Sequence, residues 1–318
     1  MKAAVVRSFD KPPRFEEFPP PTPAAGEVLV TMRAAALTQL VRSVAAGKHY
    51  SSGGRLPMIP GIDGVGIDPA GRRLYVAFPT GIHGTMAEQT AVPSIYTTPV
   101  PDGVADAAAA AIANPGMSSW AALVERAHLL PGETVLVNGA TGTSGRLAVQ
   151  IAKHLGAQRV IATGRNRALL DQLSTLGADA VVPLDSSPED LTDAFRKHLA
   201  DGVDVVLDYL WGPPAERLLA AFTSHGGADA GRRVRYVQIG SMAGATVALS
   251  SAPLRSSGLE LMGSGLGSVA PAALLRSIAG VLAALAAGQV SIDFDPVPLA
   301  DVEATWQAHS ADRVVFTL

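Results

Sequence analysis

The segment ETVLVNGATGTSGRLAVQIAKHLGAQRVIATGRN, residues 133–166, decides the fold. It opens with Thr134–Val137, a short β-branched run that predicts a buried strand. A glycine turn, Gly139–Gly145, follows, and Arg146–Leu155 then carries apolar residues at helical spacing. Arg159–Thr163 reads as a second strand. The order strand, glycine turn, helix, strand is typical of half of a dinucleotide-binding fold.

The glycines of this turn suit a bound pyrophosphate. A tight turn needs one position with positive φ, a close approach of the backbone needs a position without a side chain, and a third glycine lets the helix pack on the strand. The helix N-terminus adds unpaired N–H groups and the positive end of its dipole. The turn residues that we predict to bind the cofactor are Gly139, Ala140, Thr141, Gly142, Thr143, Ser144 and Gly145. The alternative is an ordinary glycine-rich turn that binds no ligand.

The end of the second strand predicts which nucleotide is preferred. An acidic residue there would hold the ribose 2′-hydroxyl of NAD, whereas an arginine suits the 2′-phosphate of NADP. The chain has no acid at this place, and the residues that we predict to bind are Thr163, Gly164, Arg165, Asn166 and Arg167. We therefore predict NADPH rather than NADH. The alternative is that both arginines are solvated charges at the start of the next helix.

Length and composition limit the classes of protein. The 318 residues suffice for two domains, 48% are hydrophobic, and the net charge is −3, so a large core is expected and nucleic-acid binding is not. The absence of an apolar run of membrane-spanning length predicts no contact with a membrane. Since Met1–Arg7 is charged at Lys2, no signal peptide is expected. These features predict a cytoplasmic protein.

Metal and thiol chemistry are not expected. The sequence has no cysteine, which excludes disulfides, a thiolate nucleophile and cysteine-ligated zinc. It has seven histidines, none in a His-Glu-x-x-His arrangement. We therefore predict that no metal is bound.

Two architectures alternate along the chain. Before residue 104, short strands with Gly and Pro turns predict a compact β-barrel. After it, helices alternate with six strands, which predicts a doubly wound parallel sheet in an α/β fold. The tail from Val290 returns to strand patterns and is expected to rejoin the barrel. We predict a catalytic domain from 1–116 and 288–318, and a cofactor domain from 117–287.

The chain resembles the medium-chain dehydrogenase/reductase superfamily, and within it the zinc-free quinone oxidoreductase (zeta-crystallin-like) branch. The resemblance covers nearly the whole length. The segments that carry it are Met1–Val6, Pro60–Gly66, Pro131–Val137, Gly142 with Gly145, Gly202–Asp208 and Val314–Val315. It implies a GroES-like domain plus a Rossmann domain, NADPH-dependent reduction of a quinone or α,β-unsaturated carbonyl, and a homodimer joined through the sixth Rossmann strand. Zinc-dependent relatives carry cysteine at the position of Thr38 and Gly-His-Glu at 61–63, so the resemblance implies a site without zinc.

Hydride transfer without a metal requires a proton or hydrogen-bond donor for the carbonyl oxygen. Our candidates are the hydroxyl of Thr38, with Tyr50 and His49 as alternatives. Each has a structural interpretation as well: Thr38 as a helix cap, and His49 and Tyr50 as loop surface. Asp63 is expected to hold its turn or to pair with an arginine rather than to catalyse.

Further cofactor contacts are predicted at the domain junction and in two late loops. Asn114 could direct its amide to the nicotinamide, or it could be an N-cap or turn residue before Pro115. Loops at the carboxyl ends of parallel strands line the cofactor crevice. The residues predicted there are Gly240, Ser241, Gly263, Ser264 and Gly265.

Three functions remain open from the sequence. The first is NADPH-dependent reduction of a quinone or an enone, with a small carbonyl compound or quinone as the substrate. The second is reduction of an enoyl group or a C=N bond in a specialised biosynthetic pathway. The third is an NADPH-binding structural or regulatory protein without catalytic activity.

Overall fold

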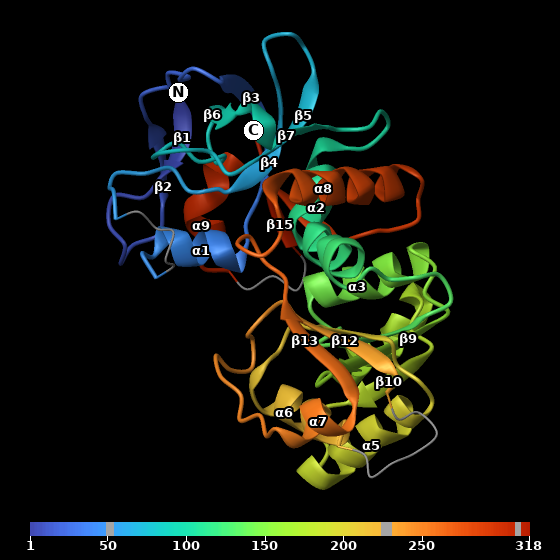
Figure 1. Cartoon of the computed structure of the whole chain (residues 1–318). Helices are drawn as coiled ribbons and strands as arrows, with labels where there is room; N and C mark the ends of the chain where they lie inside the picture. The colour runs from blue at the N-terminus through green and yellow to red at the C-terminus, as the bar shows by residue number, and fades with distance from the viewer. Residues whose placement is uncertain (49–53, 224–230, 309–312) are drawn as a thin grey trace. The chain divides into compact units, whose positions relative to one another are not determined.

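The computed structural model describes residues 1–48, 54–223, 231–308 and 313–318 (Figure 1). The chain forms two compact units. The first comprises Met1–Asn114 and Ile278–Leu318, and the second comprises Pro115–Ser277. The domains predicted from the sequence, 1–116 with 288–318 and 117–287, stay a prediction.

The first unit is built on a seven-stranded sheet and a two-stranded one. The order in the large sheet is β14-β15-β3-β4-β5-β7, and β6 also pairs with β3. All pairs in this sheet are antiparallel except β14 with β15. The strands of this unit are β1 (Lys2–Val5), β2 (Arg14–Glu17), β3 (Glu27–Ala36), β4 (Asp63–Ile67), β5 (Arg73–Ala77), β6 (Gln89–Pro93), β7 (Thr97–Pro99), β14 (Phe294–Pro298) and β15 (Arg313–Thr317).

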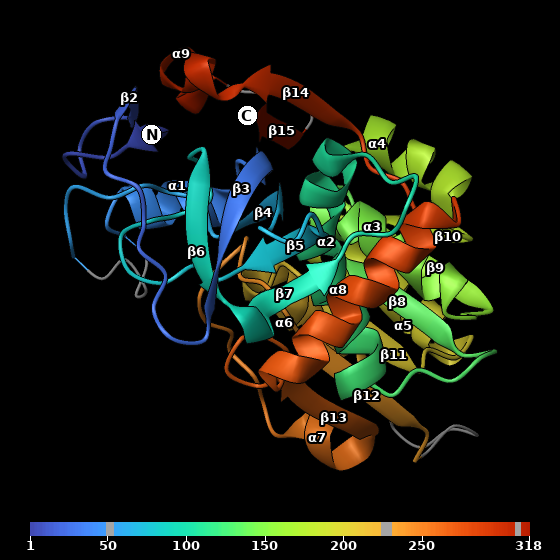
Figure 2. The ribbon, with the colours of Figure 1, turned by 90° about the horizontal axis from the view of Figure 1, so that it is seen from above.

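The long strand β3 organises this sheet because it pairs with three others. Figure 2 shows β6 beside β3, and their register runs from Glu27 opposite Pro93 to Thr31 opposite Gln89. Two helices, α1 (Gln39–Ala45) and α9 (Val302–Trp306), contribute Val41, Val302 and Trp306 to the main hydrophobic cluster of the unit.

The second unit is a six-stranded, fully parallel sheet. Its order is β10-β9-β8-β11-β12-β13, so the order reverses between β8 and β11. This is the predicted doubly wound sheet, and its six strands confirm the sequence pattern. The strands are β8 (Thr134–Asn138), β9 (Arg159–Gly164), β10 (Ala180–Pro183), β11 (Val205–Asp208), β12 (Arg233–Gln238) and β13 (Gly258–Gly263).

Helices cover both faces of this sheet. Figure 1 shows α3 (Thr143–His154) on one side of the strands and α5 (Pro188–Ala200) with α6 (Gly212–Ala221) on the other. The latter two pack Phe195 and Leu218 onto Leu136 and Val206 of the central strands. The remaining helices of this unit are α4 (Arg167–Gln172) and α7 (Ala252–Ser256).

One helix differs from the prediction. The sequence pattern predicts one helix over residues 104–113 and a second over residues 119–127, opened by residues 114–120, but α2 (Asp106–Ala121) runs without a break through Pro115. A proline inside a helix removes a single donor, and the residues before it, Ala111 to Ala113, are fully buried, so packing outweighs that loss. A π-helical turn, Ala122–Arg126, ends the segment.

The chain passes between the units within α2 and again within α8 (Pro271–Ala286). Among the described residues, no helix combines the length and apolar character needed to cross a membrane.

Candidate cofactor-binding site

The glycine turn at the carboxyl end of β8 contains three glycines in three different environments. Gly139 has φ of 92°, in the left-handed region, and a Cβ there would lie 2.8 Å from Cγ of Leu210. Gly145 lies in the first turn of α3, where a Cβ would lie 2.3 Å from the carbonyl oxygen of Gly139. These two glycines are therefore required by the fold itself.

Gly142 differs from them because nothing lies within 4 Å of the place where its Cβ would be. Its lack of a side chain leaves open space at the start of α3. Gly142 is also the N-cap of α3 and forms no side-chain hydrogen bond to the helix. The first N–H groups of α3 thus receive no side-chain cap, which is the condition under which a helix N-terminus binds an anion.

Residues at the end of β9 lie beside this turn. Gly164 is close to Thr141, since a Cβ on Gly164 would lie 2.4 Å from Cγ2 of that threonine. Thr163 is buried, and its carbonyl accepts the N–H of Ala140 at 2.7 Å. The structure thus brings the predicted strand-end residues and the glycine turn together.

The three residues after Gly164 are exposed and differ in their contacts. Asn166 is the N-cap of α4 and accepts the N–H of Leu169 at 3.1 Å. Arg167 forms two hydrogen bonds to Asp185, of 3.0 and 2.9 Å, and that pairing raises the pKa of Arg167. Arg165 forms no side-chain hydrogen bond or ion pair with any residue in the described part of the chain.

Two further predicted loops lie at the carboxyl ends of β12 and β13. Gln238 connects the two loops. Its side-chain Nε2 donates to the carbonyl of Gly240 at 2.9 Å, and its backbone carbonyl accepts the N–H of Ser264 at 2.8 Å. The carbonyl of Gly263 accepts from Nε of Arg126, a residue of the π-helical turn. Ser241 and Gly265 are exposed. Both loops lie at the carboxyl ends of the parallel strands, as the glycine turn after β8 does.

In the first unit, Thr38 is half-buried and caps α1. Its Oγ1 accepts the N–H of Val41 at 3.0 Å, which confirms the structural interpretation of this residue. The hydroxyl proton is not needed for this cap and can be donated elsewhere. The other two catalytic candidates, His49 and Tyr50, lie outside the described residues.

A buried polar cluster lies around Asp63, which is 1% exposed. Burial raises the pKa of Asp63, while the hydroxyl of Tyr75, the charge of Arg313 and the amide of Asn114 oppose that rise. The Tyr75 hydroxyl donates to Oδ2 of Asp63, and Arg313 interacts electrostatically without a hydrogen bond from its Nε or Nη2 to a described residue. Arg313 therefore acts on Asp63 through its charge, and the hydrogen bond that holds the Asp63 carboxyl comes from Tyr75.

Asn114 lies inside α2, so its interpretation as an N-cap or turn residue is wrong. The sequence analysis missed Tyr75 and Arg313. The available signal was an Asp in a predicted buried strand without a polar or charged partner nearby in the sequence. Such a residue indicates a partner from elsewhere in the chain, such as a tyrosine or an arginine.

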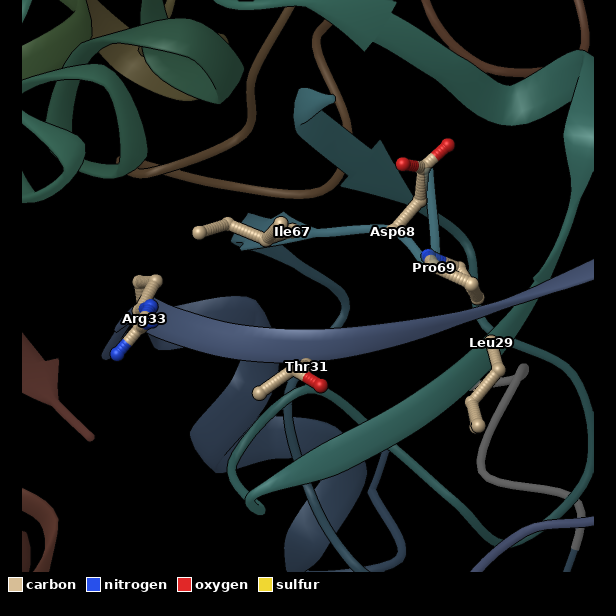
Figure 3. Close-up of a pocket in the computed structure, with 6 residues that line it drawn as sticks. All are labelled: Leu29, Thr31, Arg33, Ile67, Asp68 and Pro69. Atoms are coloured by element: carbon tan, nitrogen blue, oxygen red, sulfur yellow. The ribbon is translucent and has the colours of Figure 1, made fainter. Parts of the chain in front are cut away.

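The first unit also contains a cavity of about 350 Å³ that contains none of the predicted site residues (Figure 3). Leu29, Thr31 and Arg33 line it from β3, opposite Ile67–Pro69. Asp68 already accepts hydrogen bonds from the backbone of Ala70 and Arg72 and pairs with the Arg72 guanidinium. Among the described residues that line the cavity, the one acidic side chain is therefore already engaged.

A metal site is not supported by the residue types present. Within the described ranges, no group of three or more His, Cys, Asp or Glu side chains lies together as a metal ion would require. The sequence also lacks cysteine altogether. These residues do not fit a zinc centre of the dehydrogenase type.

Comparison with known proteins places this fold and this turn in a family. Residues 145–280 match the family described as zinc-binding dehydrogenase. A probable NADPH-dependent quinone reductase from Emericella nidulans is 30% identical over 96% of this chain and 96% of its own length. The crystal structure of the quinone oxidoreductase from Thermus thermophilus, also solved with NADPH, has a TM-score of 0.78 and 29% identity over all of both chains.

A third relative is much larger than this chain. A phenolphthiocerol/phthiocerol polyketide synthase from Mycobacterium tuberculosis is 34% identical over 68% of this chain, and the match spans 10% of that protein.

The chain belongs to the medium-chain dehydrogenase/reductase superfamily, in its quinone oxidoreductase branch. The GroES-like and Rossmann architecture expected from the sequence is confirmed. The protein is therefore an oxidoreductase of this superfamily.

Proposed function

We propose that this oxidoreductase uses NADPH, without a metal, to transfer hydride to a quinone or an α,β-unsaturated carbonyl compound. The observation that carries the proposal is the combination of an open, uncapped helix N-terminus at Gly142 with an unengaged Arg165 beside it. The first suits a pyrophosphate, and the second suits a 2′-phosphate. Similarity to the quinone reductases of Emericella nidulans and Thermus thermophilus supports this choice.

The residues of the second unit would hold the nucleotide. Backbone N–H groups of Thr143 and Ser144 can receive the pyrophosphate, and Arg165 can receive the 2′-phosphate. The loops at Gly240 and Gly263 offer main-chain groups for the nicotinamide carboxamide. The bound nucleotide supplies the hydride, and the protein has to fix the acceptor and exclude water.

Charge that develops on the acceptor oxygen needs a donor. The Thr38 hydroxyl is our first candidate, since its oxygen is fixed by the N–H of Val41 while its proton remains available. Tyr50 and His49 remain candidates from the sequence. Location in the cytoplasm also remains a prediction from the sequence.

Titration of the purified protein with NADPH and NADH tests the first step. We expect tryptophan quenching or a raised melting temperature with NADPH at lower concentration than with NADH. A panel of quinones, enones and imines then tests hydride transfer through the characteristic near-ultraviolet absorbance of NADPH. No response to NADPH in either assay would rule the proposal out, while binding without turnover of any acceptor would favour a structural or regulatory role.

A second candidate function is reduction of an enoyl group within a biosynthetic pathway. The 34% identity with part of a mycobacterial polyketide synthase favours it. Enoyl thioesters belong in the same panel for this reason. Activity on enoyl thioesters without activity on quinones would select this function over the first.

We also propose that the protein is a homodimer joined through β13. This strand is at the edge of the parallel sheet, and in the described structure β12 is its only neighbour. Leu261, on the strand, and Leu266, shortly after it, are both exposed. A strand at the edge of a sheet, with one side unpaired and apolar side chains exposed, can extend the sheet with a second copy. Light scattering after size-exclusion chromatography tests this, and a mass of 32.6 kDa would exclude it.

A further inference from the structure

Asp208, the last residue of β11, is the centre of a buried hydrogen-bond network beside the glycine turn. Its side chain is fully buried and accepts four hydrogen bonds. Oδ1 accepts from Nδ2 of Asn138 and from the backbone N–H groups of Leu210 and Trp211, at 2.9, 2.9 and 3.2 Å. Oδ2 accepts from the hydroxyl of Tyr236 at 2.7 Å.

A first route connects this carboxylate to Gly139. Asn138 ends β8 opposite Asp208, and its Oδ1 accepts the hydroxyl of Thr163 at 2.7 Å. The same Thr163 oxygen accepts the N–H of Gly139 at 3.0 Å. Asp208, Asn138 and Thr163 are all fully buried, so each of these hydrogen bonds is shielded from water.

A second route reaches the same glycine from its other side. By accepting the N–H groups of Leu210 and Trp211, Asp208 fixes the loop that follows β11, in which Trp211 has φ of 54°. The side chain of Leu210 packs against Gly139, where a Cβ would lie 2.8 Å from Cγ of that leucine. The backbone of Gly139 is thus held by a hydrogen bond and by a packing contact, and both depend on Asp208.

We propose that Asp208 is a positioning residue for cofactor binding: it holds Gly139 in the conformation in which the glycine turn receives the pyrophosphate. This inference rests on the proposed function, since it assumes that the turn binds NADPH. Asp208 lies in the sheet, at the end of β11, and acts on the glycine turn through Asn138, Thr163 and Leu210.

The chemistry of the network explains why an acceptor is needed at position 208. Four donors converge on the carboxylate, and they satisfy its two oxygens. Because the carboxylate takes the N–H of the Asn138 amide, the Asn138 oxygen is turned toward Thr163, which leaves the Thr163 oxygen free to accept from Gly139. Removal of the acceptor at 208 removes the constraint on each of these three groups.

The test compares two substitutions of Asp208 by titration with NADPH. Asp208→Ala removes every acceptor, and we expect its dissociation constant for NADPH to rise about tenfold or more. Asp208→Asn keeps an oxygen for Asn138, Leu210 and Trp211 and can donate to Tyr236, so we expect a rise of less than about threefold. The matched control is Val206→Ala, which lowers stability in the same buried strand but removes no hydrogen-bonding group of the network.

A second pair keeps the inference testable if Asp208→Ala does not fold. Thr163→Val has the shape of threonine without its hydroxyl, and it should raise the dissociation constant about fivefold, whereas Thr163→Ser should restore it. Competition with adenosine 2′-monophosphate, which has no pyrophosphate, locates the effect. Its affinity should be the same for all variants, because the network acts on the turn and not on the 2′-phosphate.

Two results would overturn the inference. One is unchanged NADPH affinity in Asp208→Ala or in Thr163→Val. The other is a rise of equal size in Val206→Ala, which would attribute the effect to stability alone. Failure of the unsubstituted protein to bind NADPH would instead contradict the proposed function, so the two failures are distinguishable.

Discussion

At the scale of single residues, the structure distinguishes between two arginines that the sequence treats alike. Both follow β9, but Arg167 is held by Asp185 through two hydrogen bonds, whereas Arg165 is exposed and has no such partner in the described part of the chain. A guanidinium already paired with a carboxylate attracts a phosphate less strongly, because the carboxylate offsets its positive charge. We infer that Arg165 would be the main determinant of the proposed preference for NADPH.

Arg165→Ala should therefore raise the dissociation constant for NADPH by about tenfold or more and leave that for NADH unchanged, since a hydrogen bond to a charged group contributes roughly 1.5–3 kcal/mol. Arg167→Ala should have a smaller effect. Arg196→Ala, an exposed arginine paired with Asp193, is the control for loss of one positive charge. Equal effects of all three substitutions would indicate a general charge effect in place of a specific contact.

Thr38 combines two possible roles that substitutions can separate. Thr38→Val removes the cap of α1 and should lower the free energy of unfolding by about 1 kcal/mol. Thr38→Asp keeps a capping oxygen but has no proton to donate at neutral pH. We expect Thr38→Asp to keep its stability and lose turnover, whereas Thr38→Ser keeps both. Full turnover by Thr38→Asp would show that Thr38 is a cap alone.

At the scale of elements, the glycine turn contains two glycines, Gly142 and Gly145, whose substitution by alanine should have different effects. Gly142→Ala adds a methyl group where the protein has open space, and its φ of −81° suits alanine, so folding should be unaffected. The methyl group would occupy the space that we assign to the pyrophosphate. We expect an unchanged melting temperature and NADPH binding weakened by about tenfold or more.

Gly145→Ala is the matched comparison in the same turn. Its Cβ would lie 2.3 Å from the carbonyl oxygen of Gly139, a backbone atom that cannot move alone. We expect a loss of about 1–3 kcal/mol in the free energy of unfolding, from crowding between helix and strand. If Gly142→Ala were instead the less stable of the two in thermal unfolding, the assignment of open space at Gly142 would be wrong.

The sequence predicts these elements well where local pattern and packing agree. The strand, turn and helix of residues 134–155 carry their periodicity, glycines and stop signals in consecutive positions, so their positions follow from the sequence. α2 shows the limit, because Pro115 predicts a break, and only burial of the surrounding alanines keeps the helix continuous. Local signals cannot report such packing.

Contacts between distant residues are the part that the sequence could not provide. Asn138 and Asp208 each end a buried strand, and a polar residue at that position is itself a signal of a role at the crevice. That they bind each other, 70 residues apart, follows only from the order β8 beside β11. The same holds for Asp63, because Tyr75, which donates a hydrogen bond to it, and Arg313, whose charge acts on it, come from other strands.

At the scale of the whole molecule, three buried tyrosines make both units sensitive to high pH. Tyr75 belongs to the first unit, and Tyr209 and Tyr236 belong to the second. Burial raises the pKa of Tyr209 to about 12, and burial together with a neighbouring carboxylate raises the pKa of Tyr75 and Tyr236 well above the ordinary value. The folded protein therefore keeps these three hydroxyls protonated at a pH at which an unfolded chain loses them.

The sign of the effect on stability follows from this difference. Because the pKa values are raised in the folded state, their contribution is fully present below pH of about 10 and is lost as the pH rises above it. We expect the free energy of unfolding to fall steadily above that pH in denaturant titrations. Ultraviolet absorbance of tyrosinate should show no more than two of the five tyrosines ionised in the folded protein at pH of about 11, and all five after unfolding. Ionisation of a third tyrosine before the loss of tertiary structure would contradict the burial of Tyr75, Tyr209 or Tyr236.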